Sequence, residues 1–255
     1  MIKSINAATT ERRVAAGALP PDLWPNVDDI VTEDDTPVDS IFSEKQQRLL
    51  TETLYNAWPG PGDGRPFLAM ANVGLFYAIH QPPLVPDALL SLDVQAPEDT
   101  EPKINRSYFV WNYGKPPDVV IEVVSNREGG EDTYKLTKYA QLGIDYYAII
   151  DPYNFLNAGR LRLFRLHGSA YQAMRPGLLP GIGLGLKLWQ GRYEDMTETW
   201  LRWFDTDGRP VPTGGELARS ARKWAEQSEA MAEVAQARAD RLAAQLRAAG
   251  IDPEA

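Results

Sequence analysis

The sequence predicts an α/β fold in which helices flank a mixed sheet, followed by a long C-terminal helix. Short apolar runs alternate with helical patterns along the chain, which is typical of α/β proteins. One run, at 119–124, consists of β-branched residues and one glutamate, without alternation of polar and apolar residues. Such a run is expected for a central strand that is buried on both faces. The segment Glu216–Ala249 contains no proline or glycine, and its apolar residues recur near heptad spacing.

The composition excludes several kinds of active site. The 255 residues are 44% hydrophobic, which is enough to build a core without disulfides. There is no cysteine, and His80 and His167 are the only histidines, so thiol catalysis, iron–sulfur clusters and multi-histidine metal sites are ruled out. Chemistry must therefore come mainly from Asp, Glu, Lys, Tyr and Ser.

Charge and hydropathy give a first expectation about location and partners. No apolar run approaches the ~18 residues of a membrane span, and the first residues lack the apolar stretch of a signal peptide, so we expect a cytoplasmic protein with no membrane contact. The net charge is −9, but seven acidic residues lie between Asp22 and Asp39. The remaining chain is almost neutral, which leaves room for a local basic groove that binds nucleic acid.

The chain is expected to have three parts. Residues 1–39 are acidic and rich in proline, which favours a flexible N-terminal arm. Residues 40–212 form the α/β domain, and residues 213–255 form the C-terminal helix. A capping box at Ser43 and Gln46 predicts the start of the first helix, and the proline–glycine run at 59–62 predicts its end.

Strands and one further helix are expected after this first helix. The apolar runs at 67–71, 74–79, 88–94, 119–124 and 146–151 predict strands, and 106–113 fits either a strand or an ordered loop. A helix is expected over about 132–142, ended by Gly143. Residues 160–166 and 171–174 predict a hairpin at the sheet edge. Residues 175–215, rich in glycine and proline, predict an irregular cap that contains Trp189, Trp200 and Trp203.

The C-terminal segment predicts self-association. Leu217, Ala221, Trp224, Met231, Ala235, Leu242 and Leu246 follow near-heptad spacing, and the segment holds six basic and five acidic residues. We expect the apolar stripe to form a coiled coil with another copy, giving a homodimer or a higher homo-oligomer. The alternative is a solitary, alanine-rich surface helix.

Glu122 is the most unusual residue of the sequence. It lies in the middle of the buried run Val119–Val124, where an unpaired carboxylate would cost several kcal/mol. Glu122 must therefore have a partner, or lie where the strand meets a cleft. The alternative to a functional role is a structural glutamate paired with a lysine or an arginine.

Two further positions are candidates for the same site. Asp87 follows Pro86 at the entrance of the strand at 88–94, although Pro–Asp is also common in plain turns. Asp93 and Asp118 are rival acids. Lys135 shares a helical stripe with Tyr139 that should face the sheet, although Lys135 also suits a surface ion pair with Glu131. Tyr139 is expected to pack against the sheet rather than to act chemically.

Two acids from adjacent strands and a nearby lysine form a chemically useful set. Two carboxylates hold a hard divalent cation such as Mg²⁺, and the cation polarises a phosphate and lowers the pKa of a bound water. An ammonium group orients that water or stabilises charge on the phosphate oxygens. The set therefore suits metal-assisted hydrolysis of phosphodiesters without histidine or cysteine.

These residues resemble a known family. The run PPDVVIEVVS at 116–125, then Lys135 and Tyr139, then LGIDYYAIIDP at 142–152, is similar to the Uma-type restriction-endonuclease family of the PD-(D/E)XK nuclease superfamily. QPPLVPDALLSLDV at 81–94 resembles its first acidic strand, and the likeness covers roughly residues 40–170. The usual lysine position of the superfamily, two residues after the acid, is Val124 here, so the lysine comes from the following helix.

The resemblance implies a restriction-endonuclease-like fold and a role for each candidate residue. Asp87 and Glu122 would bind Mg²⁺, or Mn²⁺ in its place, and Lys135 would assist the attacking water. The implied activity is hydrolysis of DNA phosphodiester bonds, with Arg106, Lys115 and Arg127 near enough in sequence to contact phosphates. The alternative is a non-catalytic module with the nuclease fold that self-associates through its C-terminal helix. The sequence leaves open whether Asp93 or Asp118 replaces Asp87, and whether the substrate is DNA or RNA.

Overall fold

The computed structural model describes residues 19–24, 26, 40–125 and 130–249. The chain divides into two units, Met1–Val211 and Pro212–Ala255, which are described separately. The arm expected over residues 1–39 lies almost entirely outside the described residues. Within it, Pro21–Leu23 form one short 3₁₀ turn, η1.

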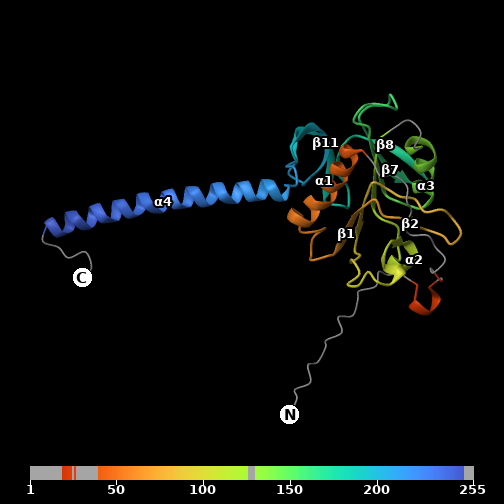
Figure 1. Ribbon diagram of the computed structural model, residues 1–255, viewed down its shortest axis with the longest axis horizontal. Coiled ribbons are helices and arrows are strands. Elements are labelled where there is room, and N and C mark those ends of the chain that lie inside the picture. Colours follow the sequence, from red (N-terminus) through yellow and green to blue (C-terminus); the bar gives the residue numbers. More distant parts are fainter. Residues whose placement is uncertain (1–18, 25, 27–39, 126–129, 250–255) are drawn as a thin grey trace, which may run out of the picture. The chain divides into compact units, whose positions relative to one another are not determined.

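A six-stranded mixed sheet forms the centre of the first unit (Figure 1). Its strands, in spatial order, are β1 (Phe67–Ala71), β3 (Ala88–Leu92), β5 (Val119–Val123), β6 (Tyr146–Ile150), β7 (Leu161–His167) and β8 (Ala170–Met174). The β5–β6 pair is parallel and the other pairs of this sheet are antiparallel. The predicted α/β fold with a mixed sheet is confirmed.

Helices cover both faces of this sheet (Figure 1). Helix α1 (Ile41–Ala57) packs on the face that carries Val119, Ile121 and Val123. The opposite face, with Val120, is covered by the π-helical turn η3 (Glu131–Lys135) and by α3 (Leu136–Gln141), which follows it directly. Every residue of β5 is buried, as its unbroken β-branched pattern predicts for a central strand.

The start of α1 differs from the sequence prediction. The N-cap is Ser40, whose side chain accepts a hydrogen bond from the Ser43 backbone N–H at 3.2 Å. Ser43 itself lies inside the helix and is buried. The predicted capping box at Ser43 was therefore wrong by one turn, because an earlier serine satisfies the free N–H groups of the first turn.

Two smaller groups of elements border the sheet. The strand predicted over 74–79 is reduced to β2 (Leu75–Phe76), which pairs in parallel with β4 (Tyr108–Phe109). Residues 106–113 are neither one strand nor a loop, since β4 leads directly into the short helix α2 (Val110–Tyr113). The 3₁₀ turn η2 (Lys103–Asn105) precedes them.

The irregular cap predicted over 175–215 was wrong. This region contains a second sheet of β9 (Gly177–Leu179), β10 (Leu184–Tyr193) and β11 (Met196–Phe204), all antiparallel. Its inner side packs on α1, with the Phe42 and Trp200 rings stacked at 5.0 Å and the Trp203 indole donating to the Leu50 carbonyl at 2.8 Å. The tryptophans therefore belong to a regular sheet that shares a core with α1.

Gln46 joins α1 to this second sheet. It is fully buried, its Nε2 donates to the Leu201 carbonyl at 2.9 Å, and its Oε1 accepts from the Leu201 N–H at 2.8 Å. The Gln46 side chain thus satisfies both the backbone N–H and the backbone carbonyl of Leu201 in β11.

Replacing Gln46 by alanine is expected to lower the free energy of unfolding by ~2–6 kcal/mol. Both backbone groups of Leu201 would stay buried without a partner, at ~1–3 kcal/mol each. Urea unfolding followed by tryptophan fluorescence measures the change. Asn56→Ala, at an exposed position of the same helix, is the control and should change stability by less than ~0.5 kcal/mol. Equal stabilities of the two variants would contradict this role of Gln46.

The second unit contains helix α4 (Gly214–Ala248). Thr213 and Glu216 form a reciprocal capping box at its start, with bonds of 3.1 and 2.8 Å. No side chain of α4 is buried. None of the helices in the described part of the chain combines the length and the hydropathy that a membrane crossing requires.

Candidate active site

Glu122 lies near the end of the central strand β5, on the sheet face that η3 and α3 cover. Its side chain is 1% exposed. The Lys135 ammonium donates to Oε2 at 2.8 Å, and the Tyr139 hydroxyl donates to Oε1 at 2.6 Å. The buried carboxylate is therefore bound by a cation and a phenol, both from the segment that directly follows its strand.

Asp87 lies beside Glu122, directly before the neighbouring strand β3. The antiparallel register pairs Ala88 with Ile121, so the next position outward places Asp87 opposite Glu122. Oδ2 of Asp87 accepts the Val123 N–H at 2.7 Å, and Oδ1 accepts Nε2 of Gln47 at 2.6 Å. The structure thus brings together the three residues singled out in the sequence: Asp87, Glu122 and Lys135.

Lys135 reaches Glu122 because the start of its helix is fixed to the sheet. The Tyr147 hydroxyl of β6 donates to the Glu131 carbonyl at 2.8 Å, and Arg162 of β7 pairs with Asp132 at 3.3 Å. The turn Glu131–Lys135 is π-helical, and the Lys135 N–H donates to the Gly130 carbonyl at 3.0 Å. Such wide turns are found frequently at functional sites. Lys135 does not form the surface ion pair with Glu131 that was the alternative.

Burial and charge shift the protonation of this cluster. Burial raises the pKa of Glu122 to about 8, an increase that Lys135 and Tyr139 oppose and that the nearby Asp87 charge supports. Burial also acts against the charged form of Lys135, but the Glu122 carboxylate outweighs it and the pKa of Lys135 is raised. Burial raises the pKa of Tyr139 well above its usual value, so its hydroxyl remains a donor. A cation beside Glu122 would favour the ionised carboxylate.

The rival acids lie at the opposite end of the sheet. Asp93 forms two bonds with the Arg65 guanidinium, at 2.6 and 2.7 Å. Asp118 is bound by Lys115 at 2.6 Å and by the Leu92 N–H at 2.7 Å. Asp118 precedes Glu122 by four residues on one strand, a separation of ~13 Å. Neither acid therefore meets Glu122, and each already has a structural partner.

Two residues of the cluster have roles that the sequence did not reveal. Gln47 orients Asp87 from α1, across the end of the sheet, and the one sequence signal for it is a polar side chain beside the apolar stripe of α1. Tyr139 was expected only to pack. It does pack, with its ring 5.1 Å from that of Tyr147, but it also binds Glu122 through its hydroxyl.

The basic residues considered for phosphate contacts do not gather at this cluster. Lys115 is bound to Asp118 at the other end of the strand. Arg106 donates to the carbonyls of Thr100 and Glu101 in its own loop. Arg127 lies outside the described residues.

The residues present fit a divalent cation of the magnesium type. Asp87 and Glu122 offer carboxylate oxygens from adjacent positions of the sheet, and each Glu122 oxygen, which accepts one hydrogen bond, has a second lone pair. Among the described residues no group of three or more His, Asp or Glu side chains forms a metal cluster. Mg²⁺ commonly uses one or two carboxylates and completes its shell with water and substrate oxygens, so two acids suffice.

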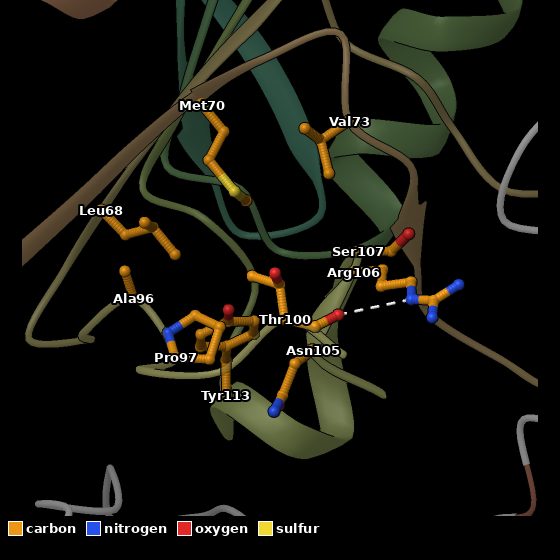
Figure 2. A pocket seen from close by; sticks show the side chains of 10 residues that line it. All are labelled: Leu68, Met70, Val73, Ala96, Pro97, Thr100, Asn105, Arg106, Ser107 and Tyr113. Atoms are coloured by element: carbon orange, nitrogen blue, oxygen red, sulfur yellow. Dashed lines mark hydrogen bonds between the residues drawn. The ribbon is translucent and has the colours of Figure 1, made fainter. Parts of the chain in front are cut away.

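A separate pocket lies over β1, on the sheet face that also carries Glu122. Figure 2 shows Leu68 and Met70 pointing into it, with Ala96, Pro97 and Tyr113 around it. Its volume is about 460 Å³. None of the three candidate residues lines it, and its lining contains no carboxylate, so we assign it no part in the chemistry at Glu122.

Comparisons with known proteins identify the family. Residues 29–182 match the Uma2 family model, described as "Putative restriction endonuclease". A solved structure of "a putative nuclease belonging to DUF820 from Anabaena variabilis" is 14% identical, with a TM-score of 0.39, and the match covers 56% of this chain and 73% of that one. No curated protein matches the sequence. Since the family model spans more than half of the chain, the protein belongs to the Uma2 family, as the motifs around Asp87, Glu122 and Lys135 suggested.

Proposed function

We propose that the protein is a Mg²⁺-dependent endonuclease that hydrolyses DNA phosphodiester bonds at the Asp87–Glu122–Lys135 cluster. The observation that carries the proposal is the 2.8 Å contact between the Lys135 ammonium and the buried Glu122 carboxylate, with Asp87 opposite, directly before β3. Two acids and one amine at a strand end form a donor set that suits metal-assisted phosphodiester hydrolysis. DNA as the substrate is proposed from the family description.

Each residue of the cluster has a distinct task in this proposal. A divalent cation held by Asp87 and Glu122 would supply Lewis-acid polarisation of the phosphate and a more acidic water. Lys135 donates hydrogen bonds, so its ammonium orients the attacking water or stabilises negative charge that develops on the phosphate. Gln47 and Tyr139 hold the two carboxylates in position through their 2.6 Å bonds. Glu122 lies in a dry environment, which strengthens these interactions.

The direct test is a cleavage assay with purified protein. Duplex and single-stranded DNA are incubated with Mg²⁺ or Mn²⁺, and in parallel with EDTA. We expect cleavage that needs the metal and that is absent from the matched double variant Asp87→Asn/Glu122→Gln prepared in the same way. RNA of the same sequence tests the substrate class. Equal cleavage by both proteins would identify a contaminant and remove the catalytic proposal.

A second candidate is a non-catalytic module that keeps the nuclease fold. The hydrogen bonds that Lys135 and Tyr139 donate to the two Glu122 oxygens favour it, since a purely structural ion pair would look the same. Titration with Mn²⁺ separates the two candidates. Binding that disappears in the double variant supports the nuclease, and no binding by the wild-type protein supports the module.

A further inference from the structure

The pocket over β1 begins close to the candidate active site. Met70 of its lining pairs with Leu89 of β3, which follows Asp87 by two residues, or ~7 Å along the strand. Val73, which also lines the pocket, directly follows Asn72, whose N–H donates to the Asp87 carbonyl at 3.3 Å. A group attached to a phosphate that is bound at Asp87 is therefore within reach of the pocket.

One wall of the pocket is the loop between β3 and β4, which is held in place by its own hydrogen bonds. Arg106 donates to the carbonyls of Thr100 and Glu101 at 3.3 and 2.8 Å, and Figure 2 shows the first of these bonds. The Asn105 amide donates to the Asp99 carbonyl at 2.8 Å. The wall is thus formed before any ligand enters, which lowers the entropy lost on binding.

The lining suits an uncharged ring. Of the described residues that line the pocket, only Arg106 is charged, and its guanidinium binds the carbonyls of the loop. Met70 points into the pocket, and a thioether makes favourable contacts with aromatic rings (Figure 2). Tyr113 adds an aromatic wall that is fixed by stacking on Tyr108, with ring centroids 4.4 Å apart. The pocket therefore favours a flat ring over a phosphate group.

Ser107 gives the pocket a hydrogen-bonding group that the fold does not use. The residue is 4% exposed and lines the pocket, and its hydroxyl has no hydrogen-bond partner among the described residues. A hydroxyl both donates and accepts hydrogen bonds. The edges of nucleobases also carry donors and acceptors, so Ser107 can bind any of them.

We propose that this pocket holds one unpaired base of a nucleic-acid strand whose phosphodiester lies at the Asp87–Glu122–Lys135 cluster. Enzymes that act on nucleic acids hold an unstacked base between apolar and aromatic side chains and bind its edge by hydrogen bonds. The volume of about 460 Å³ is within the ~300–1,000 Å³ of small-molecule pockets. The inference rests on the proposed function, since a strand at the cluster is what brings a base to this position.

The proposal adds a preference for single strands to the proposed function. A base in an intact duplex is paired and stacked, and its extrusion costs free energy that an unpaired base does not lose. We therefore expect a single strand to compete for the protein at least ~5-fold better than a duplex of the same sequence.

Fluorescence anisotropy tests the proposal on the full chain. A labelled single strand is compared with a strand of the same length and charge that has no bases, with Ca²⁺ in place of Mg²⁺ and a gel to confirm that the strand stays intact. We expect the wild-type protein to bind the strand with bases at least ~5-fold more tightly, the size of effect found for a base stacked on an aromatic side chain.

Two variants assign this preference to the pocket. Ala96→Phe fills the pocket from its exposed rim and should bind both strands equally, and Ser107→Ala should have a reduced preference. Gln95→Phe, at the adjacent exposed position outside the lining, is the matched control and should keep the full preference. Circular dichroism confirms that each variant is folded. Full preference in Ala96→Phe or in Ser107→Ala, its loss in Gln95→Phe, or equal binding of both strands by the wild-type protein would overturn the inference.

The inference and the proposed function fail in different ways. Base-dependent binding that Ala96→Phe abolishes, without metal-dependent cleavage by the wild-type protein, would support the pocket and remove the nuclease. Cleavage by Ala96→Phe with the kcat and KM of the wild-type protein would overturn the pocket and leave the nuclease in place.

Discussion

Replacing Glu122 by glutamine is expected to abolish metal-dependent DNA cleavage, by at least ~10³-fold, and to remove the loss of stability with rising pH that the wild-type protein shows without metal. The loss of cleavage follows because one of the two acidic metal ligands is removed. A bound metal stabilises the transition state by several kcal/mol, and each ~1.4 kcal/mol changes the rate tenfold. Glutamine keeps the shape of the side chain: its carbonyl oxygen accepts the hydrogen bond from Lys135, and its amide NH₂ donates to the Tyr139 hydroxyl instead of accepting from it. The fold should therefore be retained.

The stability difference between the variant and the wild-type protein has a defined dependence on pH. Burial raises the pKa of Glu122 to about 8 in the folded protein, from its ordinary value of 4.5. Between these two values the folded state holds a proton that the unfolded state has lost, so wild-type stability falls as the pH rises, by at most ~1.4 kcal/mol per pH unit. Glutamine does not titrate. The stability difference between the variant and the wild-type protein should thus grow from pH 5 to about pH 8 and then level off.

Urea unfolding of both proteins in EDTA from pH 5 to pH 9 measures this effect, and Mn²⁺ calorimetry measures the loss of metal binding. Asp118→Asn, on the same strand but at the other end of the sheet, is the control and should bind Mn²⁺ like the wild-type protein. A stability difference that stays constant from pH 5 to pH 9 would show that Glu122 is not the titrating group. Unchanged Mn²⁺ binding in Glu122→Gln would exclude it as a metal ligand.

Replacing Lys135 by methionine is expected to reduce cleavage by ~10²–10³-fold, the range found when a charged or polar group that stabilises the transition state is removed. Metal binding should change in the opposite direction. The ammonium lies 2.8 Å from Glu122 and therefore repels a divalent cation at the same carboxylate. Without it, Mn²⁺ should bind Lys135→Met at least as tightly as it binds the wild-type protein. Metal binding and cleavage are thus separated in this variant.

Cleavage rates at saturating Mn²⁺, together with calorimetry, measure the two effects of Lys135→Met. Lys138→Met is the matched control, since Lys138 lies on the same helix and its amine is over the Tyr134 ring rather than at Glu122. Its cleavage should remain within a factor of two or so of the wild-type rate. Wild-type cleavage by Lys135→Met would exclude the amine from the reaction, and a loss of Mn²⁺ binding would assign it a structural role.

The sequence predicted the central part of the site because its signals are local. The run Val119–Val124 identifies a strand that is buried on both faces, and a glutamate within it must have a partner. The helix that follows packs back on the same sheet, so its inward stripe meets that glutamate. Lys135 and Tyr139 are therefore within reach of Glu122 for reasons that a short segment of sequence contains.

Contacts between distant segments were not predictable in the same way. Gln47 meets Asp87 only because α1 crosses the end of the sheet, and Gln46 meets Leu201 across most of the chain. The second sheet was missed because glycine and proline are usual in loops, whereas here Gly185 and Gly191 lie inside β10. A β-carbon at Gly185 would lie 2.7 Å from the Gly177 carbonyl oxygen, so the glycine allows two strands to approach closely.

The π-helical turn Glu131–Lys135 has a consequence for how this family can vary. A π turn contains one residue more than an α turn, and removing one residue from a helix rotates everything beyond the deletion by about 100°. Deletion of one residue here would give a regular α-helical turn with the usual α-helical hydrogen bonds. It would also direct the amine of Lys135 away from the acid. In a related chain, the length of this turn should therefore indicate whether a lysine can lie beside the acid of the central strand.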